Sequence, residues 1–253
     1  MQGKVIIVTG ASDGIGHAAA RRLAHDGAHV VMAARGAEKL AAAAQAIEAT
    51  GGSVETAIVD IADGAALDAM IAETARRHGR LDGLVNNAAR VSMGQITDVT
   101  DEEWDATFKA GIDAVFVATR AALRIMIPQG SGAIVNISST NGRRAMPWMG
   151  SYSASKAAIV HFSKIAAMEG GPHGVRVNAL APGMVLTPGN AAFYADQPDA
   201  LGAVTAAIPA RRGGTPEEVA GAIRFLLSDD AGYVNGVCLD VDGGKAAQLY
   251  MPS

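Results

Sequence analysis

Short runs of apolar residues alternate along the chain with longer segments in which apolar residues recur every three or four positions. Seven of these runs are predicted to be strands, at 4–9, 29–33, 54–59, 83–85, 133–137, 175–179 and 237–241. Their hydrophobicity is continuous rather than alternating, which is typical of strands covered on both faces, as in a parallel sheet.

The segments between these runs are predicted to be helices. Three of them carry an apolar stripe at helical spacing: Ile15, Ala18, Ala19 and Leu23; Leu67, Ile71 and Ala75; and Val219, Ile223, Leu226 and Leu227. The alanine-rich segment 37–49 is predicted to be another helix. Asp63 and Asp101 stand where N-caps belong, and Thr215 precedes Pro216 as a cap precedes a proline at the first helical position. This alternation predicts an α/β fold with a doubly wound parallel sheet, in a single domain over 1–253.

One segment departs from the alternation. Residues 188–214 include Phe193, Tyr194 and two prolines after Pro188. A long insert in a compact domain is usually a functional lid or binding loop, and a plain surface excursion is the alternative. We expect a substrate lid at about 188–214.

Composition excludes several classes of protein. The chain has 253 residues, of which 49% are hydrophobic and 18% charged, with a formal net charge of −4, so it is long enough for a large core and unlike a disordered protein. It lacks an apolar run of about 18 residues for a membrane span, and its first apolar run is short for a signal peptide. The absence of basic runs argues against nucleic acid or an anionic membrane as partner. The single cysteine, Cys238, fits a reducing compartment, and we expect a cytoplasmic protein.

The first predicted strand leads directly into a glycine-rich turn at 9–16, Thr-Gly-Ala-Ser-Asp-Gly-Ile-Gly, and then into a helix. Glycines permit a tight turn and let the backbone approach a ligand. The helix N-terminus adds unpaired N–H groups and the positive end of its dipole, which together bind pyrophosphate. The spacing differs from the common dinucleotide fingerprint, but its position indicates a dinucleotide site. The alternative is a set of glycines that serves the turn alone.

This turn resembles the signature of the short-chain dehydrogenase/reductase family. Further matches follow in order along nearly the whole chain: Asp60, Asn86-Asn87-Ala88, Tyr152-x3-Lys156, Pro182-Gly183 with Thr187, and Val241-Asp242-Gly243-Gly244. The resemblance implies a three-layer Rossmann fold, a nicotinamide dinucleotide cofactor, and a homotetramer or homodimer.

The resemblance also implies where the cofactor binds. Asp60 resembles the residue that contacts adenine, while Asn87 and Thr187 resemble those that line the adenosine ribose and the nicotinamide carboxamide. The expected contacts are Gly10, Ser12, Asp13, Gly14, Ile15, Gly16, Arg35, Asp60, Ile61, Asn87, Tyr152, Lys156, Pro182, Gly183, Val185 and Thr187.

The end of the second predicted strand bears on the choice between NAD(H) and NADP(H). An NAD site normally offers a carboxylate there for the ribose 2′-hydroxyl, whereas an arginine suits a 2′-phosphate. This strand ends in Ala33-Ala34-Arg35, which favours NADP(H) because a guanidinium can bind the phosphate bidentately. Asp13 argues the other way, and Arg35 as a solvated loop residue is the alternative, so NAD(H) stays possible.

Tyr152 and Lys156 are four positions apart and therefore project from one face of a helix. A phenol with a pKa near 10 is a poor base, but a nearby ammonium and an oxidised nicotinamide lower its pKa. Tyr152 is thus predicted to exchange a proton with the oxygen of a ketone or alcohol. By resemblance, Ser139 orients that oxygen, and its spacing to Tyr152 distinguishes it from Ser138. Lys156 would also hold the nicotinamide ribose.

Two positions depart from the family pattern. Counting from Trp104 and to Phe116 places Gly111 where the family has an asparagine that extends a proton relay from the lysine. Either water or another side chain such as Asn141 completes the relay, or catalysis is slowed, or the protein is a non-catalytic nucleotide-binding regulator. Ala89-Arg90 replaces the usual glycine, so Arg90 faces either substrate or solvent.

The substrate is expected to bind among loops at the carboxyl ends of the strands. These loops carry Met93, Met146, Trp148, Met149, Phe193 and Tyr194, which suit an apolar or aromatic ketone or alcohol or else pack a lid or an interface. Arg143 and Arg144 could attract an anion, although a solvated turn is the alternative. A nucleotide-sugar epimerase shares Tyr-x3-Lys but has a longer chain. The six histidines lack metal-ligand spacing, so no metal is expected.

Overall fold

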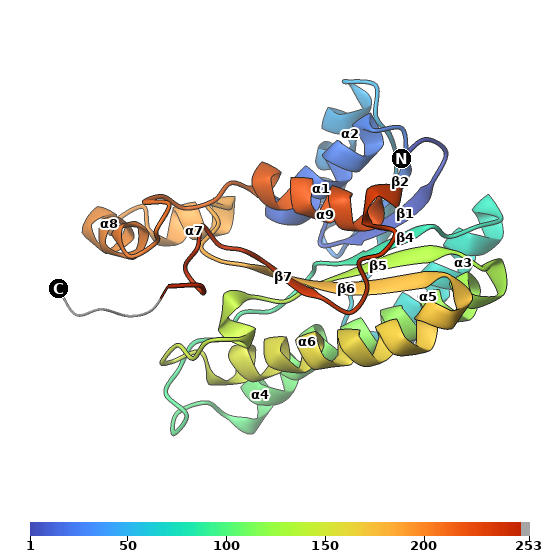
Figure 1. Cartoon of the computed structure of the whole chain (residues 1–253). Coiled ribbons are helices and arrows are strands. Elements are labelled where there is room, and N and C mark those ends of the chain that lie inside the picture. Colours follow the sequence, from blue (N-terminus) through green and yellow to red (C-terminus); the bar gives the residue numbers. More distant parts are fainter. Residues whose placement is uncertain (249–253) are drawn as a thin grey trace.

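The computed structural model describes residues 1–248, which build one seven-stranded parallel sheet (Figure 1). Its strands are β1 (Val5–Thr9), β2 (His29–Ala34), β3 (Ser53–Ile58), β4 (Gly83–Asn86), β5 (Gly132–Ile137), β6 (Val175–Pro182) and β7 (Cys238–Val241). They are arranged in the order β3-β2-β1-β4-β5-β6-β7, and each adjacent pair is parallel. The predicted doubly wound sheet is confirmed.

The burial of the strands explains why their sequence pattern is continuous. Every residue of β1 and of β4 is buried, because helices cover both faces of the sheet there. Edge strand β3 instead alternates, with Val54 buried and Glu55 and Ile58 partly or largely exposed. An edge strand meets solvent on its free side, so polar residues are tolerated in it.

Helices form a layer on each face of the sheet, as Figure 1 shows. One layer consists of α1 (Gly14–His25), α2 (Ala37–Glu48) and α9 (Pro216–Leu227), and the other of α3 (Gly64–His78), α5 (Ala114–Gln129) and α6 (Gly150–Gly170). The buried apolar residues accordingly fall into two clusters, one under each layer. Burial of this apolar area is the main force that holds the three layers together.

The predicted caps are confirmed at two helices and wrong at a third. Asp63 accepts a hydrogen bond from the Ala66 N–H at the start of α3, and Thr215 forms a capping box on α9. At α4 (Asp101–Phe108) the cap is Thr100, which accepts from the Glu103 N–H at 3.2 Å. Asp101 is the first helical residue instead, where its charge still favours the helix dipole.

The family pattern predicts that Gly111 lies inside a helix, where glycine costs about 1 kcal/mol relative to alanine, but in the structure Gly111 does not lie inside a regular helix. It sits in a π-helical turn, η1 (Lys109–Asp113), between α4 and α5, with φ −101° and ψ −105°. Single π-turns interrupt helices at functional sites more often than elsewhere. The usual cost of glycine in a helix therefore does not apply at this position.

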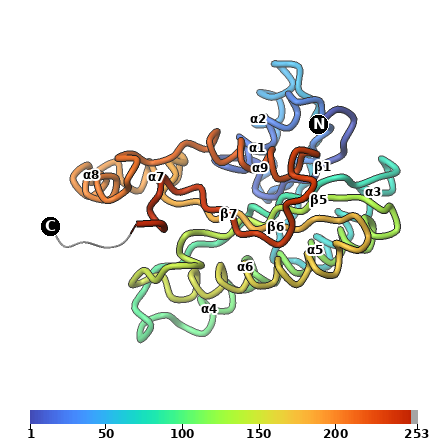
Figure 2. Tube along the Cα trace, viewed as in Figure 1, coloured from blue at the N-terminus to red at the C-terminus, as the bar shows by residue number. Residues whose placement is uncertain are grey.

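The segment 188–214 contains two short helices, α7 (Pro188–Phe193) and α8 (Pro198–Ala206), rather than an irregular loop. Its ends are held together, because the Leu186 N–H donates to Gly214 O at 2.8 Å and the Gly214 N–H donates to Met184 O at 2.9 Å. The chain trace shows the segment projecting beyond the end of β6 (Figure 2).

Four short helical turns complete the fold. These are η1, η2 (Thr140–Gly142), η3 (Gly171–His173) and η4 (Asp229–Ala231). Among residues 1–248, none of the helices combines the length and the apolar character needed to cross a bilayer.

Candidate active site

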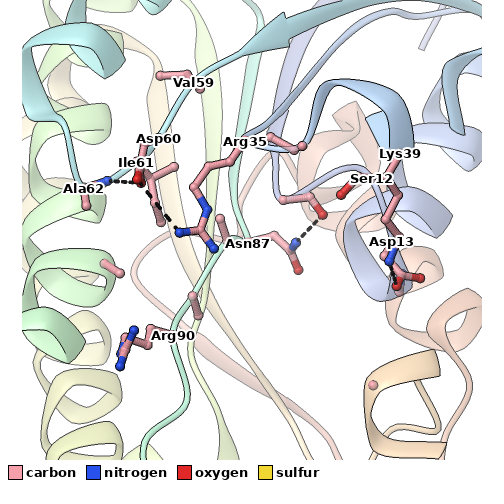
Figure 3. Close-up of a pocket in the computed structure, with 18 of the residues that line it drawn as sticks. Ser12, Asp13, Arg35, Lys39, Val59, Asp60, Ile61, Ala62, Asn87 and Arg90 are labelled. Carbon is pink, nitrogen blue, oxygen red and sulfur yellow. Dashed lines mark hydrogen bonds and ion pairs between the residues drawn. The ribbon is translucent and has the colours of Figure 1, made fainter. Parts of the chain in front are cut away.

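A cleft of about 1040 Å³ opens at the carboxyl ends of β1 and β4, where the strand order reverses direction. Open α/β sheets bind their ligands at this point. Ten of the residues predicted to contact a cofactor line the cleft: Gly10, Ser12, Asp13, Gly14, Ile15, Arg35, Asp60, Ile61, Asn87 and Thr187. Figure 3 shows several of them facing one another from separate elements.

The glycine turn has the shape of a ligand cradle. Gly10 and Gly14 have φ of +65° and +52°, which residues with a side chain rarely adopt. A Cβ added to Gly10 would lie 2.8 Å from Asn87 Nδ2, and one added to Gly16 would collide with Gly10 O. The glycines thus let α1 start directly against the end of β1, with its N-terminal N–H groups facing the cleft. This arrangement fits the pyrophosphate of a dinucleotide.

Thr9 and Asn87 connect the turn to the neighbouring strand. Thr9 Oγ1 accepts hydrogen bonds from the Asn87 and Ala88 N–H groups at 3.0 and 3.1 Å. The Asn87 amide in return donates to Thr9 O at 3.0 Å and to Gly10 O at 3.3 Å. These reciprocal bonds fix the geometry of both sides of the cleft.

Basic side chains gather at the end of the cleft next to β2. Arg35 is largely exposed, and its guanidinium lies 3.9 Å from Asp60. Lys39 on α2 also lines the cleft and pairs with Asp13 at 2.5 Å. Burial acts to raise the pKa of Asp13, but hydrogen bonds from Lys39 and the Gly14 N–H outweigh it and lower that pKa. The negative charge of Asp13, which argues against a 2′-phosphate at this end of the cleft, is therefore balanced by the positive charge of Lys39.

Lys39 is a site residue that sequence reasoning missed. It lies in the first turn of the alanine-rich helix, and no motif marks it. Its only signal was its position four residues after Arg35, since a helix that follows a binding loop presents its first turn to the same ligand. Arg90, left open between substrate and solvent, lines the cleft as well.

Six predicted contacts do not line this cleft. Gly16 is buried behind the turn, Pro182 and Val185 are buried at the end of β6, and Gly183 packs against Asp242. Tyr152 and Lys156 lie on α6 and are not among the residues that line the cleft. Their assignment as cofactor contacts stays a prediction.

Lys156 is buried and held at the end of β5. Its ammonium donates to Ile137 O at 2.7 Å, and its side chain is 3% exposed. Burial lowers the pKa of Lys156 to about 8, because the charged form loses its hydration. Its Nζ atom is 5.6 Å from the centre of the Tyr152 ring, so the two side chains adjoin as the four-residue spacing predicts.

Ser139 completes the group. Burial raises the pKa of Tyr152, while the neighbouring Ser139 hydroxyl lowers it in part. Ser138 is turned away, since its hydroxyl donates to Lys156 O at 2.8 Å. The three side chains Ser139, Tyr152 and Lys156 thus come together at the carboxyl end of β5. This group combines a phenol, a hydroxyl and a cation, as proton transfer to a polarised oxygen requires.

The space beside Gly111 is already occupied. A Cβ added to Gly111 would collide with the hydroxyl of Ser155, which is 2% exposed on the facing α6. An asparagine at this position therefore requires Ser155 to move. Among the described residues, Asn141 makes no hydrogen bond to Lys156 that would replace the missing asparagine at position 111. Its side-chain amide lies 3.8 Å from Met146 Sδ instead.

Large apolar side chains stand exposed around the carboxyl ends of β4, β5 and β6. At least half of the surface is exposed in each of Met93, Met146, Trp148 and Phe193, whereas Met149 is buried. The loops carrying the first three are joined, since the Gly94 N–H donates to Trp148 O at 2.8 Å. The two arginines nearby are engaged: Arg143 pairs with Asp240, and Arg144 donates to Ala246 O.

Comparison with known proteins agrees with this arrangement. A family model described as enoyl-(acyl carrier protein) reductase matches residues 10–246. A Streptomyces virginiae protein described as a ketoacyl reductase of monensin polyketide synthase is 40% identical over 251 residues, which span 95% of this chain and 96% of that protein. Human dehydrogenase/reductase SDR family member 4 is 36% identical over 247 residues, or 97% of this chain and 88% of the human one.

Solved structures give the same picture. Levodione reductase superposes with a TM-score of 0.94 at 33% identity, covering 98% of this chain and all of the other. A variant of actinorhodin polyketide ketoreductase solved with NADPH has a TM-score of 0.93 at 33% identity, over 98% of this chain and 100% of that one.

Proposed function

The chain belongs to the short-chain dehydrogenase/reductase family and is an NAD(P)-dependent oxidoreductase, and from that premise we propose that it transfers a hydride between NADP(H) and a secondary alcohol or ketone. The observation that carries the proposal is the group formed by Ser139, Tyr152 and Lys156 at the carboxyl end of β5. In it a phenol that can exchange a proton adjoins a hydroxyl and a buried cation.

Each residue of this group has a distinct part in the proposed reaction. The Ser139 hydroxyl holds the substrate oxygen, and Tyr152 donates its proton to that oxygen in reduction or accepts one in oxidation. Burial raises the pKa of Tyr152, which opposes loss of the proton. Lys156, when charged, stabilises the resulting phenolate and brings that pKa down. The group therefore works as a unit.

The residues of the cleft fit a nicotinamide dinucleotide. The turn from Gly10 to Gly16 would hold the pyrophosphate, while Asp60, Asn87 and Thr187 would position the adenine, the ribose and the carboxamide. When bound, the nicotinamide supplies or accepts the hydride. The chain's own residues orient the two reactants and handle the proton.

Two cations support a preference for NADP(H). Arg35 and Lys39 line the same end of the cleft, where Lys39 is paired with Asp13 and the Arg35 guanidinium lies 3.9 Å from Asp60. Such a site attracts a 2′-phosphate through charge-assisted hydrogen bonds, which are about twice as strong as neutral ones. A 2′-hydroxyl, which carries no charge, would gain little from either side chain.

Titration of NADPH and NADH by protein fluorescence, followed by turnover assays on a panel of ketones, tests both parts of the proposal. We expect tighter binding of NADPH and oxidation of NADPH by a ketone. The Arg35→Ala variant should lose about 10- to 100-fold in NADPH affinity, as expected for one charge-assisted contact, and keep its NADH affinity. Arg124→Ala, an exposed arginine on α5 away from the cleft, serves as the control. Tighter binding of NADH would contradict the cofactor preference but leave the chemistry intact.

The second candidate is a nucleotide-binding regulator without turnover, which Gly111 favours. The amide that would extend a relay from Lys156 is missing, and Ser155 fills the adjacent space. Tight binding of cofactor with no turnover of any ketone would support this alternative. The presence of Ser139, Tyr152 and Lys156 favours the enzyme.

We further infer an apolar or aromatic substrate and a lid over it. Met93, Met146, Trp148 and Phe193 supply an adaptable apolar surface where the substrate would bind. The segment with α7 and α8 is joined to the rest of the fold at its ends, between Val185 and Gly214, and near Ala210, whose N–H donates to Gly243 O at 3.1 Å. The helices α7 and α8 bury none of their own residues, which suits a lid that moves on that base.

A further inference from the structure

Three metal-ligating side chains converge at the amino ends of the strands, far from the cleft in the topology of the sheet. Within residues 1–248, His29 at the start of β2, Glu55 on β3 and His78 at the end of α3 bring one ligand atom each to within 4.8 Å of one another. Residues 23 to 49 positions apart in sequence meet because β2 and β3 are neighbours and α3 returns the chain along them. The spacing of histidines along the sequence, from which no metal was expected, cannot predict such a cluster.

The distances suit a small ion with little rearrangement. His78 Nε2 lies 3.2 Å from Glu55 Oε1, and His29 Nε2 lies 3.8 Å from Glu55 Oε2. In a tetrahedral zinc site, bonds of 2.0–2.1 Å place the ligand atoms about 3.3 Å apart. The two imidazole rings are already side by side, with centres 4.7 Å apart.

The surroundings of His29 orient it as a ligand. Its Nδ1 lies 2.8 Å from Ser53 Oγ, and its Nε2 is buried without a hydrogen-bond partner. Metal-binding histidines usually donate the second ring N–H to such an outer group, which aims the free nitrogen at the ion.

Arg77 already binds the carboxylate of Glu55, which an ion would also bind, but Arg77 has a second partner. Its guanidinium donates to both oxygens of Glu55, at 2.9 and 2.7 Å. It also lies 3.6 Å from Glu73, one turn earlier on α3. An ion that takes one oxygen of Glu55 would leave Arg77 the other oxygen and Glu73. The three ligand side chains are each about a quarter exposed, so an ion can enter from solvent.

We propose that His29, Glu55 and His78 form a binding site for a divalent transition metal ion of the zinc class, with water in the fourth position. Two imidazoles and one carboxylate are a donor set typical of such ions, whereas magnesium and calcium prefer oxygen ligands alone. The site is structural: it joins edge strand β3 and strand β2 to the end of α3. It lies away from the residues proposed for catalysis, and it does not depend on the proposed function.

The test uses the full chain, freed of metal by a chelator and of any histidine tag. Zn²⁺ is titrated against a chromophoric competitor, and thermal unfolding is followed with and without the ion. We expect one Zn²⁺ per chain and a rise in Tm of about 5–10 °C at a Zn²⁺ concentration a hundredfold above Kd. Co²⁺ in its place should give the intense visible absorption of a four-coordinate ion.

Variants separate this site from adventitious binding. His29→Ala and His78→Ala should each weaken Zn²⁺ binding at least tenfold and at least halve the rise in Tm. Ser53→Ala should weaken binding about tenfold through the outer hydrogen bond. His173→Ala removes an exposed histidine of η3 and should change nothing. Glu55→Gln keeps the shape of the side chain and removes its charge, so it should also weaken Zn²⁺ binding. It tests the site if an alanine variant fails to fold. Equal Zn²⁺ binding by all variants, or none by the unaltered chain at 100-fold molar excess, would overturn the proposal.

Discussion

At Tyr152 the surrounding structure works against ionisation of the phenol. Burial raises its pKa, and the Ser139 hydroxyl offsets this in part. Removing the hydroxyl in Tyr152→Phe deletes the proton donor and leaves the ring, so turnover should fall by about 10²- to 10⁴-fold while the NADPH dissociation constant stays the same. Tyr233→Phe, at a fully exposed tyrosine, is the matched control. A rate within a few-fold of the unaltered chain would rule out the proton-transfer role.

Lys156 predicts a dependence of stability on pH whose sign can be worked out. Burial lowers its pKa to about 8 in the folded chain, against an ordinary value of 10.5. Between these pH values the unfolded chain holds the proton and the folded chain does not, so the free energy of unfolding rises with pH. From pH 8 to pH 9.5 this single residue should add about 2 kcal/mol.

Lys156→Met removes the titrating group and is the variant to compare. Denaturation curves at pH 8 and pH 9.5 should show the added stability in the unaltered chain and its loss in the variant. Other groups titrate in both proteins, so the difference between the two isolates Lys156. Parallel pH profiles would mean that Lys156 keeps an ordinary pKa in the fold.

Single residues differ in how far the sequence predicts their position. Tyr152 and Lys156 could be placed together because four positions on a helix always share a face. Lys39 and the partners of His29 could not, because their proximity depends on how α2, β3 and α3 pack across the sheet. Side chains that meet only in the tertiary structure carry no local signal.

At the scale of elements, the turn η1 meets α6 through one tight contact. Gly111 leaves room for the Ser155 hydroxyl, and any side chain at 111 would collide with it. Gly111→Asn should therefore lower the free energy of unfolding by about 1–3 kcal/mol, the usual cost of overpacking, and should not raise activity by itself.

A double-mutant cycle checks this contact. Ser155→Ala frees the space, so Gly111→Asn should cost less in the Ser155→Ala background than in the unaltered chain, with a coupling of about 0.5–3 kcal/mol. Independent effects of the two changes would show that the turn relaxes in another direction. Activity measured on the stable double variant then tests whether an amide at 111 improves the proton relay.

The sequence predicts the strands and the main helices because each depends on a local pattern of burial. Strand ends differ from the prediction by at most a few residues, as in β6, which continues to Pro182. The cap of α4 was misplaced because Thr100 and Asp101 are both good cap residues and only backbone geometry separates them. The π-turn at Gly111 could not be predicted, since no local motif marks it and Gly111 lies against Ser155 of α6, a contact that only the tertiary structure makes.

At the scale of the whole molecule, different surfaces serve different purposes. The cleft and the group around Tyr152 lie at the carboxyl ends of the strands, and the His29–Glu55–His78 cluster lies at the amino ends near one edge of the sheet. The outer faces of α5 and α6 form a third surface. A substitution on one of these surfaces is therefore expected to change the property assigned to that surface and to leave the properties of the other two unchanged.

This third surface predicts self-association. Phe116 on α5 and Ile165 and Met168 on α6 expose 44%, 44% and 77% of their surface, although each is a large apolar residue. Phe116 contacts Phe162 of α6 edge to face, so the two helices present one continuous apolar face. Exposed apolar patches of this kind mark protein–protein interfaces, and homo-oligomers bury the same patch on each subunit.

Light scattering after size-exclusion chromatography should accordingly give the mass of a dimer or tetramer of the 25.7 kDa chain. Met168→Asp places a charge at the most exposed of these three apolar residues, and the species should become smaller because burying an unpaired charge in an interface costs more free energy than the apolar contact contributes. Ile58→Asp, at an equally apolar and exposed residue on β3, controls for the charge itself. If the unaltered chain is a monomer, or if Met168→Asp leaves its mass unchanged, the face formed by α5 and α6 is not the interface, and its exposed apolar residues need another explanation.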